Sequence, residues 1–287
     1  MYIAKFEAKA KLLAKNSMMK TYKKGARMHK MIDGISVYTF GEVSNQAIVF
    51  IHGFPFDHTL WDGVISELKD EYYCISYDIR GFGKSEAKTA QFTMESYTQD
   101  LESVILGLEL DNPILCGFSM GGYVALRANE RKNYKALILA NTATNSDSDE
   151  AKLKRAAGIS KIDAKGVEPF VDDFFSVAFS KNFANKEPLK IEKLKRNIMS
   201  INPLGIKAAL LAMISRTDTT QSLQKIDVPV LLITAQNDKV IPKETMEEMT
   251  SKIKNSTLVS LNESGHMSMI EDPVGFRDAV KKFLKSL

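Results

Sequence analysis

The chain has 287 residues, a net charge of +4, 44% apolar residues and 26% charged residues, values typical of a soluble globular protein. It contains no run of 18 apolar residues, so we expect no transmembrane helix. Its two cysteines, Cys74 and Cys116, lie in apolar, strand-like runs, and we interpret them as small buried side chains rather than a disulfide or a metal pair. Free cysteines suit a reducing compartment, so we expect a cytoplasmic protein.

The amino-terminal residues 1–27 are expected to form a separate basic arm. Residues 1–30 contain eight lysines, one arginine and one acid, so their net charge is +8 and the rest of the chain carries −4. Apolar residues recur in the arm at helical spacing, at Ile3, Phe6, Ala10 and Leu13. The arm is either solvated or in weak contact with an anionic membrane surface, and both interpretations stay open. The mildly acidic remainder favours no nucleic-acid partner.

From residue 28 onward, apolar runs alternate with helix-like segments, which predicts a mostly parallel sheet covered on both faces. Asp33-Gly34 is typical of a two-residue hairpin turn. The expected strands are Met28–Ile32, Ile35–Phe40, Ala47–Ile51, Tyr72–Tyr77, Ile114–Cys116, Lys135–Asn141, Val230–Ala235 and Thr257–Leu261. The expected helices are Leu60–Leu68, Met94–Leu108, Gly122–Asn129, Lys243–Ile253 and Val274–Leu287.

The alternation stops in residues 142–220, where helix-like stretches occur without a convincing buried strand. We therefore expect one α/β core, residues 28–141 and 221–287, with a helical cap inserted at 142–220. The insertion has an aromatic stripe at roughly helical spacing, Phe170, Phe174, Phe175 and Phe179. The stripe can pack the cap on the core, form an apolar wall over a site, or do both.

A serine flanked by glycines, Gly117-Phe118-Ser119-Met120-Gly121, lies between an apolar run and a helix-like segment. A strand, a sharp turn and a helix in this order are typical of a nucleophile elbow. Glycines remove the Cβ clashes that such a turn would create. The pattern predicts that Ser119 is a nucleophile.

A serine hydroxyl needs a base within hydrogen-bond reach, and the base needs an acceptor that orients it. Of the four histidines, His266 lies in the loop after the last expected strand, where active-site loops of such sheets occur. Asp238 is the first carboxylate after strand Val230–Ala235. We therefore predict that Ser119 is the nucleophile, Asp238 the orienting acid and His266 the base. Nucleophile, acid and base in this order along the sequence are typical of one class of hydrolases.

The chain resembles the α/β-hydrolase superfamily over residues 30–287, in its cap-bearing branch of esterases and lactonases. His52-Gly53-Phe54-Pro55 followed by Trp61 is similar to the oxyanion loop of that family. The resemblance implies an α/β-hydrolase fold and an oxyanion hole made of the backbone N–H groups of Phe54 and Met120. The segment from Asp78 to Ser85 is similar to the family's D-x-R-G-x-G-x-S motif, which implies that Asp78 and Arg80 brace loops. A serine at position 119 departs from family members that carry an aspartate there.

These features predict a serine hydrolase that cleaves small to medium apolar carboxylic esters through an acyl-enzyme. The expected substrate pocket is lined by Trp61, Phe170, Phe174 and Met267. The alternatives are hydrolysis of a C–C bond, an enol-lactone or a carrier-bound methyl ester by the same residues, or ligand reception without turnover. Neither a cofactor nor a metal is expected, because the chemistry needs none and no ligand spacing is seen.

Overall fold

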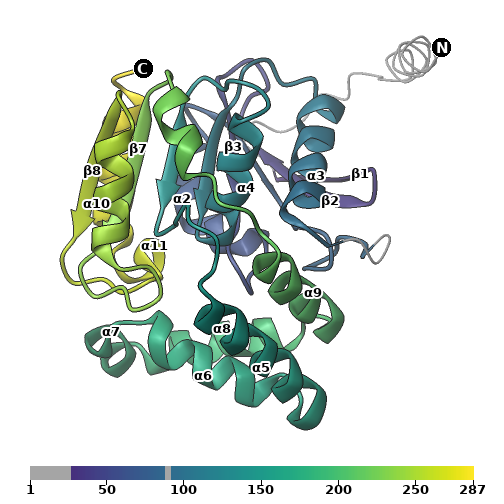
Figure 1. Ribbon diagram of the computed structural model, residues 1–287. Coiled ribbons are helices and arrows are strands. Elements are labelled where there is room, and N and C mark those ends of the chain that lie inside the picture. Colours follow the sequence, from purple (N-terminus) through teal and green to yellow (C-terminus); the bar gives the residue numbers. More distant parts are fainter. Residues whose placement is uncertain (1–26, 88–91) are drawn as a thin grey trace.

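The computed structural model describes residues 27–87 and 92–287. The predicted arm and its membrane contact fall almost entirely on residues 1–26, outside the described residues. Within the described ranges, one eight-stranded sheet has the order β1-β2-β4-β3-β5-β6-β7-β8 (Figure 1). The strands are β1 (Met28–Ile32), β2 (Ile35–Phe40), β3 (Ala47–Ile51), β4 (Tyr73–Tyr77), β5 (Ile114–Phe118), β6 (Leu137–Ala140), β7 (Val230–Ala235) and β8 (Ser256–Leu261).

The sheet is mostly parallel, as predicted. β1 and β2 form the antiparallel hairpin, in which Ile32 pairs with Ile35, and β2 is antiparallel to β4. Asp33 and Gly34 make the turn at φ 48° and 75°, the left-handed backbone that this dipeptide favours. All pairs from β4 to β8 are parallel, so the carboxyl ends of these strands meet at one edge of the sheet.

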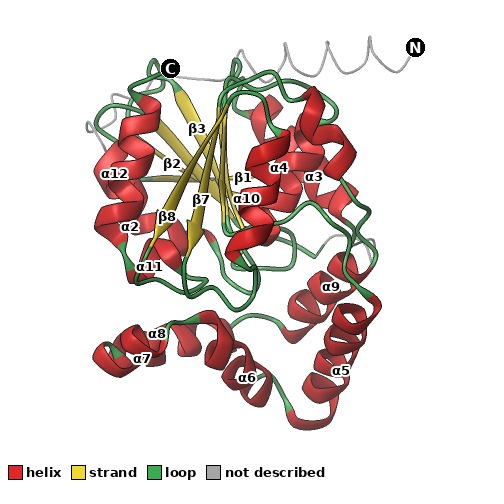
Figure 2. Ribbon diagram, turned by 60° about the vertical axis from the view of Figure 1, so that its left-hand side comes forward, coloured by secondary structure: helices red, strands yellow, loops and turns green. Residues whose placement is uncertain are grey.

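Helices cover both faces of the sheet (Figure 2). On one side lie α2 (Asp62–Leu68) and α12 (Pro273–Leu284), which contact each other, and on the other lie α3 (Met94–Gly107), α4 (Met120–Asn129) and α10 (Lys243–Lys252). The helix expected at Leu60–Leu68 starts as a 3-10 turn, η1 (His58–Trp61), because the Asp57 side chain accepts the N–H of Thr59. A second such turn, η2 (Thr220–Lys225), precedes β7, and a short helix, α11 (Ser268–Glu271), follows β8.

Residues 142–220, all of them described, contain five α-helices and no strand. They are α5 (Asp149–Lys165), α6 (Glu168–Ala178), α7 (Lys181–Lys186), α8 (Pro188–Met199) and α9 (Pro203–Ile214). We call these residues the helical insertion. It lies at one end of the sheet, apart from the flanking helices (Figure 2), with α5 packed on α6 and α9.

The helical insertion is closed at its base by hydrogen bonds between its two ends, and it meets the core at α9. Its first and last segments are joined where Thr219 donates its N–H to the carbonyl of Thr144 at 3.0 Å. Asp147 in the first segment also accepts from Arg216 in the last at 3.2 Å. At α9, a Cβ on Gly205 would lie 1.9 Å from the carbonyl oxygen of Gly81, so the helix and the loop after β4 meet backbone to backbone.

The two cysteines are free and buried, as predicted. Burial raises the pKa of Cys74 to about 12, so its thiol stays protonated. Within the part of the chain that the structure covers, no single helix has the length and apolarity to cross a bilayer, although α8 and α9, bent by 93° at their junction, meet those criteria as a pair.

The contact between Gly205 and Gly81 predicts that alanine at position 205 destabilises the protein, although alanine usually stabilises a helix relative to glycine. Gly205→Ala should lower the free energy of unfolding by about 1–3 kcal/mol, because the new methyl group has no space. Gly63→Ala in α2 is the matched control, since a Cβ there meets nothing within 4 Å, and should stabilise by about 0.5–1 kcal/mol. Urea unfolding of both variants measures the difference, and a Gly205→Ala variant as stable as wild type would contradict the packing.

Candidate active site

Ser119 lies at a sharp turn between β5 and α4. Its backbone angles are φ 51° and ψ −117°, a strained conformation for a residue with a side chain. A Cβ on Gly117 would lie 2.5 Å from the Gly121 carbonyl oxygen, and one on Gly121 would lie 2.1 Å from that of Ile51. Glycine at both positions therefore allows the turn to form against the neighbouring strand β3.

The structure brings the three predicted side chains together at the carboxyl ends of their strands. Ser119 follows β5, Asp238 follows β7 and His266 follows β8. His266 Nε2 lies 3.0 Å from Ser119 Oγ, and His266 Nδ1 lies 2.8 Å from Asp238 Oδ2. Because a carboxylate only accepts, the Nδ1–H donates to Asp238 and leaves Nε2 to accept the serine proton. All three side chains are buried, so these hydrogen bonds lie in a medium that screens them weakly.

Asp238 is held as a carboxylate by several donors. The N–H groups of Val240 and Ile241 donate to its Oδ1 at 2.8 and 2.9 Å, and Asn141 Nδ2 donates to its Oδ2 at 2.9 Å. Burial by itself raises the pKa of Asp238, but His266 and these donors outweigh it, so the pKa lies below its usual range. The acid beside the imidazole therefore stays ionised at neutral pH.

Two polar residues that the sequence reasoning missed support this carboxylate. Asn141 directly follows β6, and Ser268 Oγ donates to its Oδ1 at 2.6 Å, which fixes the orientation of the amide. Asn141 has a left-handed backbone, φ 46°, which asparagine tolerates better than most residues. Its position after a buried strand, at the same edge as Asp238, is the sequence signal that could have identified it.

The other three histidines lie elsewhere. His52 directly follows β3, and its Nε2 accepts the N–H of Ile79 at 2.9 Å. His58 begins η1 and donates from Nδ1 to Asp78 at 2.6 Å. His29, in β1, is hydrogen-bonded to Ser36. None of these three has a hydrogen bond to Ser119 among the described residues.

The two backbone groups expected to form an oxyanion hole lie on different elements, one next to Ser119 in sequence and the other after a neighbouring strand. Met120 is the first residue of α4, where backbone N–H groups have no partner inside the helix. Phe54 lies in the loop after β3, the strand next to β5. The backbone hydrogen bonds of residues 27–87 and 92–287 include none donated by the N–H of Phe54 or Met120. Both groups are thus free to donate to another acceptor.

The predicted pocket residues fall into two environments. Phe170 and Phe174 of α6 are half-buried, and their rings lie 5.9 and 6.2 Å from that of Phe54 in edge-on contacts. Trp61, by contrast, is fully buried between Phe50 of β3 and Phe276 of α12. The structure therefore gives Trp61 a core position and not a pocket position, because its large ring fills space beneath η1.

Met267, the remaining predicted pocket residue, is also fully buried. Its N–H donates to the carbonyl of Ala178, the last residue of α6, at 3.3 Å. Beside it, Ser180 N–H donates to Glu271 at 2.9 Å. The loop that carries His266 is thus hydrogen-bonded to the helical insertion directly over the site.

A cavity of about 230 Å³ lies between α8 and the core. Its apolar lining includes Phe56, Leu60, Val64, Leu194, Ile198 and Ile270. None of the described residues around it belongs to the hydrogen-bonded chain of Ser119, His266 and Asp238. The cavity is therefore a feature of the contact between the helical insertion and the core, and it is distinct from the contact of the α6 rings with Phe54.

Because the pKa of Asp238 is lowered, Asn141→Gly should destabilise the protein in a pH-dependent way. This substitution removes the amide and keeps the left-handed backbone. A folded pKa below the unfolded value of about 3.9 stabilises the protein above that pH, and the contribution is lost as the pH falls through the folded pKa. Losing one donor should cost about 1.5–3 kcal/mol of unfolding free energy at pH 7. In urea unfolding, the difference in unfolding free energy between wild type and Asn141→Gly should become smaller below about pH 4.

Asn112→Gly is the matched control, since Asn112 is exposed and has the same left-handed backbone, φ 41°. It should show no such pH dependence. A difference between wild type and Asn141→Gly that stays constant from pH 7 to pH 3 would contradict the role of Asn141.

Comparison with known proteins agrees with this geometry. The profile of the alpha/beta hydrolase fold family matches residues 46–273. A 3-oxoadipate enol-lactonase of Acinetobacter baylyi is 28% identical over 86% of this chain and 91% of its own. A pimeloyl-[acyl-carrier protein] methyl ester esterase of Legionella pneumophila is 27% identical over 83% and 95%. The structure of a thermophilic esterase from Thermogutta terrifontis superposes with a TM-score of 0.84 at 30% identity, over 91% of this chain and 98% of that one. The chain belongs to the α/β hydrolase family.

Proposed function

We propose that the protein hydrolyses small to medium apolar carboxylic esters through a covalent acyl-serine intermediate. The observation that carries the proposal is the unbroken hydrogen-bond chain, 3.0 Å from Ser119 Oγ to His266 Nε2 and 2.8 Å from His266 Nδ1 to Asp238. It gives a hydroxyl, its base and the orienting acid within reach of one another before any substrate is bound. Esterase and lactonase relatives support the same reaction class.

In the first half of the reaction, Ser119 Oγ attacks the ester carbonyl carbon while its proton passes to His266 Nε2. The tetrahedral intermediate then expels the alcohol, which takes that proton from the imidazolium. This leaves an acyl-serine and a neutral imidazole. Water repeats the cycle: His266 accepts a water proton as the hydroxide adds to the acyl carbon, and returns it to Ser119 Oγ as the carboxylic acid leaves.

Charge develops on the carbonyl oxygen in both tetrahedral intermediates. We place this oxygen against the N–H groups of Phe54 and Met120, which lack backbone acceptors among the described residues. Such a donor pair acts mainly in the transition state, and loss of one donor typically costs about 2.7–4 kcal/mol. Since Met120 begins α4, the positive end of the helix dipole adds to the effect.

The substrate class follows from the wall over the serine. Phe170 and Phe174 on α6 contact Phe54, so the space beside the nucleophile is bounded by aromatic rings. We propose that the helical insertion is a cap, and that Phe170 and Phe174, whose side chains keep some exposed surface, line an apolar acyl or alcohol pocket. The buried free cysteines support a cytoplasmic location.

Lactone hydrolysis is the second candidate, because an enol-lactonase matches 86% of the chain. A lactone is a cyclic ester, so the same atoms act and the leaving alcohol stays tethered to the acyl group. A panel that pairs linear p-nitrophenyl esters with small lactones and enol-lactones separates the two, since the preferred substrate has the larger kcat/KM. Equal inactivity toward every member would contradict both and favour a ligand receptor.

The direct test of the mechanism is Ser119→Ala. Turnover of p-nitrophenyl butyrate should fall by about 10⁴-fold or more, because the variant lacks the hydroxyl that attacks the ester carbonyl. Ser160→Ala, at an exposed serine of α5, is the control and should keep wild-type turnover. A Ser119→Ala variant with near-full turnover would remove the proposed nucleophile.

A second test concerns the aromatic wall. Phe174→Ala should widen the space next to Phe54 and raise kcat/KM for the hexanoate ester relative to the butyrate. Each additional buried methylene is worth about 0.8 kcal/mol, or about fourfold, and hexanoate has two more than butyrate, so the ratio should rise by up to about 15-fold. Phe183→Ala on α7 is the control, because Phe183 stacks on Phe179 and has no ring contact with Phe54. An unchanged ratio in Phe174→Ala would place the acyl chain elsewhere.

A further inference from the structure

The loop between β3 and η1 carries Phe54 and is held at both ends by imidazoles. At its start, His52 Nδ1–H donates to the Gly53 carbonyl at 3.0 Å, and His52 Nε2 accepts the N–H of Ile79 at 2.9 Å. At its end, His58 donates to Asp78 Oδ1 from its backbone N–H at 2.9 Å and from Nδ1 at 2.6 Å. The His58 and His52 rings are thus hydrogen-bonded to Asp78 and Ile79, the two residues directly after β4.

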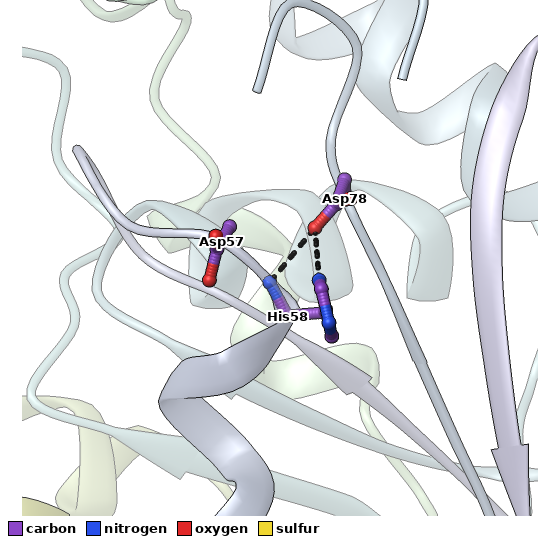
Figure 3. Close-up of side chains that lie close together, drawn as sticks. All are labelled: Asp57, His58 and Asp78. Atoms are coloured by element: carbon purple, nitrogen blue, oxygen red, sulfur yellow. Dashed lines mark hydrogen bonds and ion pairs between the residues drawn. The ribbon is translucent and has the colours of Figure 1, made fainter. Parts of the chain in front are cut away.

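Asp78 is a rigid anchor for the second of these attachments (Figure 3). It is fully buried, and its Oδ2 accepts the N–H of Lys84 at 2.9 Å. Its carbonyl accepts from Ser85 Oγ at 2.5 Å. A Cβ on Gly83 would lie 2.3 Å from the Asp78 carboxylate, so the loop after β4 closes tightly around it. A group bonded to Asp78 is therefore tied to the sheet itself.

The other side of the His58 ring is packed as well. The ring stacks on Tyr38 of β2, with centroids 3.6 Å apart and planes 15° from parallel. Its Nε2 contacts the guanidinium of Arg27, which also lies 4.3 Å above the Tyr38 ring. His29 stacks on the same tyrosine at 4.7 Å. His58 is thus fixed in orientation by stacking, and its Nδ1–H can point only at Asp78.

Asp57, His58 and Asp78 lie close together (Figure 3), and their possible ligand atoms are within 4.8 Å of one another. Those atoms already have hydrogen-bond partners. Asp57 accepts from Thr59, Asp78 accepts three N–H groups, and Nε2 of His58 faces the Arg27 cation. Arg27 would repel a metal ion at this position, so the arrangement favours a structural clamp over a metal site.

We propose that His58 is a positioning residue for the oxyanion hole. Through Asp78 it fixes the far end of the loop Gly53–Asp57, so that the N–H of Phe54 keeps its direction toward the carbonyl oxygen. The loop is short, and Phe56 N–H donates back to the Gly53 carbonyl at 3.0 Å, so a shift at residue 58 is passed to Phe54. This inference rests on the proposed ester hydrolysis. Misplacement of a transition-state donor by about 1 Å can cost about 10²-fold in rate.

Two substitutions of similar polarity test the proposal in the full chain. In His58→Asn, the amide N–H takes the place of Nδ1–H and can still donate to Asp78. In His58→Gln, the longer side chain places its amide near the Nε2 position, toward Arg27. We expect His58→Gln to lower kcat for p-nitrophenyl butyrate by about 10–100-fold with KM changed by less than about threefold, and His58→Asn to restore most of kcat. His29→Asn, in the same aromatic stack but without a bond to Asp78, should keep wild-type kcat.

A trifluoromethyl ketone analogue of the substrate provides a readout that a merely structural role would not change. It forms an oxyanion on Ser119, so its affinity should fall in His58→Gln in parallel with kcat/KM. Equal kcat for His58→Gln and His58→Asn, or a loss of kcat without a loss of analogue affinity, would overturn the proposal. Wild-type protein that hydrolyses no ester would instead overturn the proposed function, and the inference with it.

Discussion

The buried hydrogen bonds that join Ser119, His266 and Asp238 are the interactions on which the site depends. They span three loops from distant parts of the chain, and they exist because parallel strands deliver these loops to one edge of the sheet. The two outer residues of this hydrogen-bonded series, Ser119 and Asp238, are each held in place by their own neighbours. The strained turn at Ser119 is permitted by glycines, and Asp238 is kept ionised by backbone N–H groups and Asn141. The imidazole between them therefore has one orientation and one tautomer.

The sequence predicted the core of the fold well because its signals are local. The Asp33-Gly34 turn, the apolar runs of β3 and β7 and the glycines around Ser119 each determine structure within a few residues. The positions of Ser119, Asp238 and His266 after three strands then followed from the topology. Asn141 and Ser268 were not predicted: the position of Asn141 after a buried strand was an available signal, but its bond to Ser268 joins residues 127 positions apart and has no local pattern. Trp61 was assigned to the pocket from its residue type, but long-range packing with Phe50 and Phe276 places it in the core.

The helical insertion contacts loops at the edge of the sheet. It contacts the core at Gly81, at the loop that carries His266 and at Phe54, which follow β4, β8 and β3. The rings of Phe170 and Phe174 in α6 pack against Phe54, and the imidazoles of His52 and His58 tie the loop that carries Phe54 to the residues after β4. The proposed function assigns the chemistry to the edge of the sheet and the selection of substrates to the insertion.

The most direct test of the central claim is where and how fast a fluorophosphonate reacts with the folded protein. The account predicts one phosphonate per chain, mapped by mass spectrometry to the peptide that contains Ser119. It also predicts that His266→Ala slows this labelling by at least about 10³-fold, because the hydroxyl loses its base. Labelling at another residue, or an unchanged rate in His266→Ala, would show that the hydrogen-bonded chain does not activate the serine.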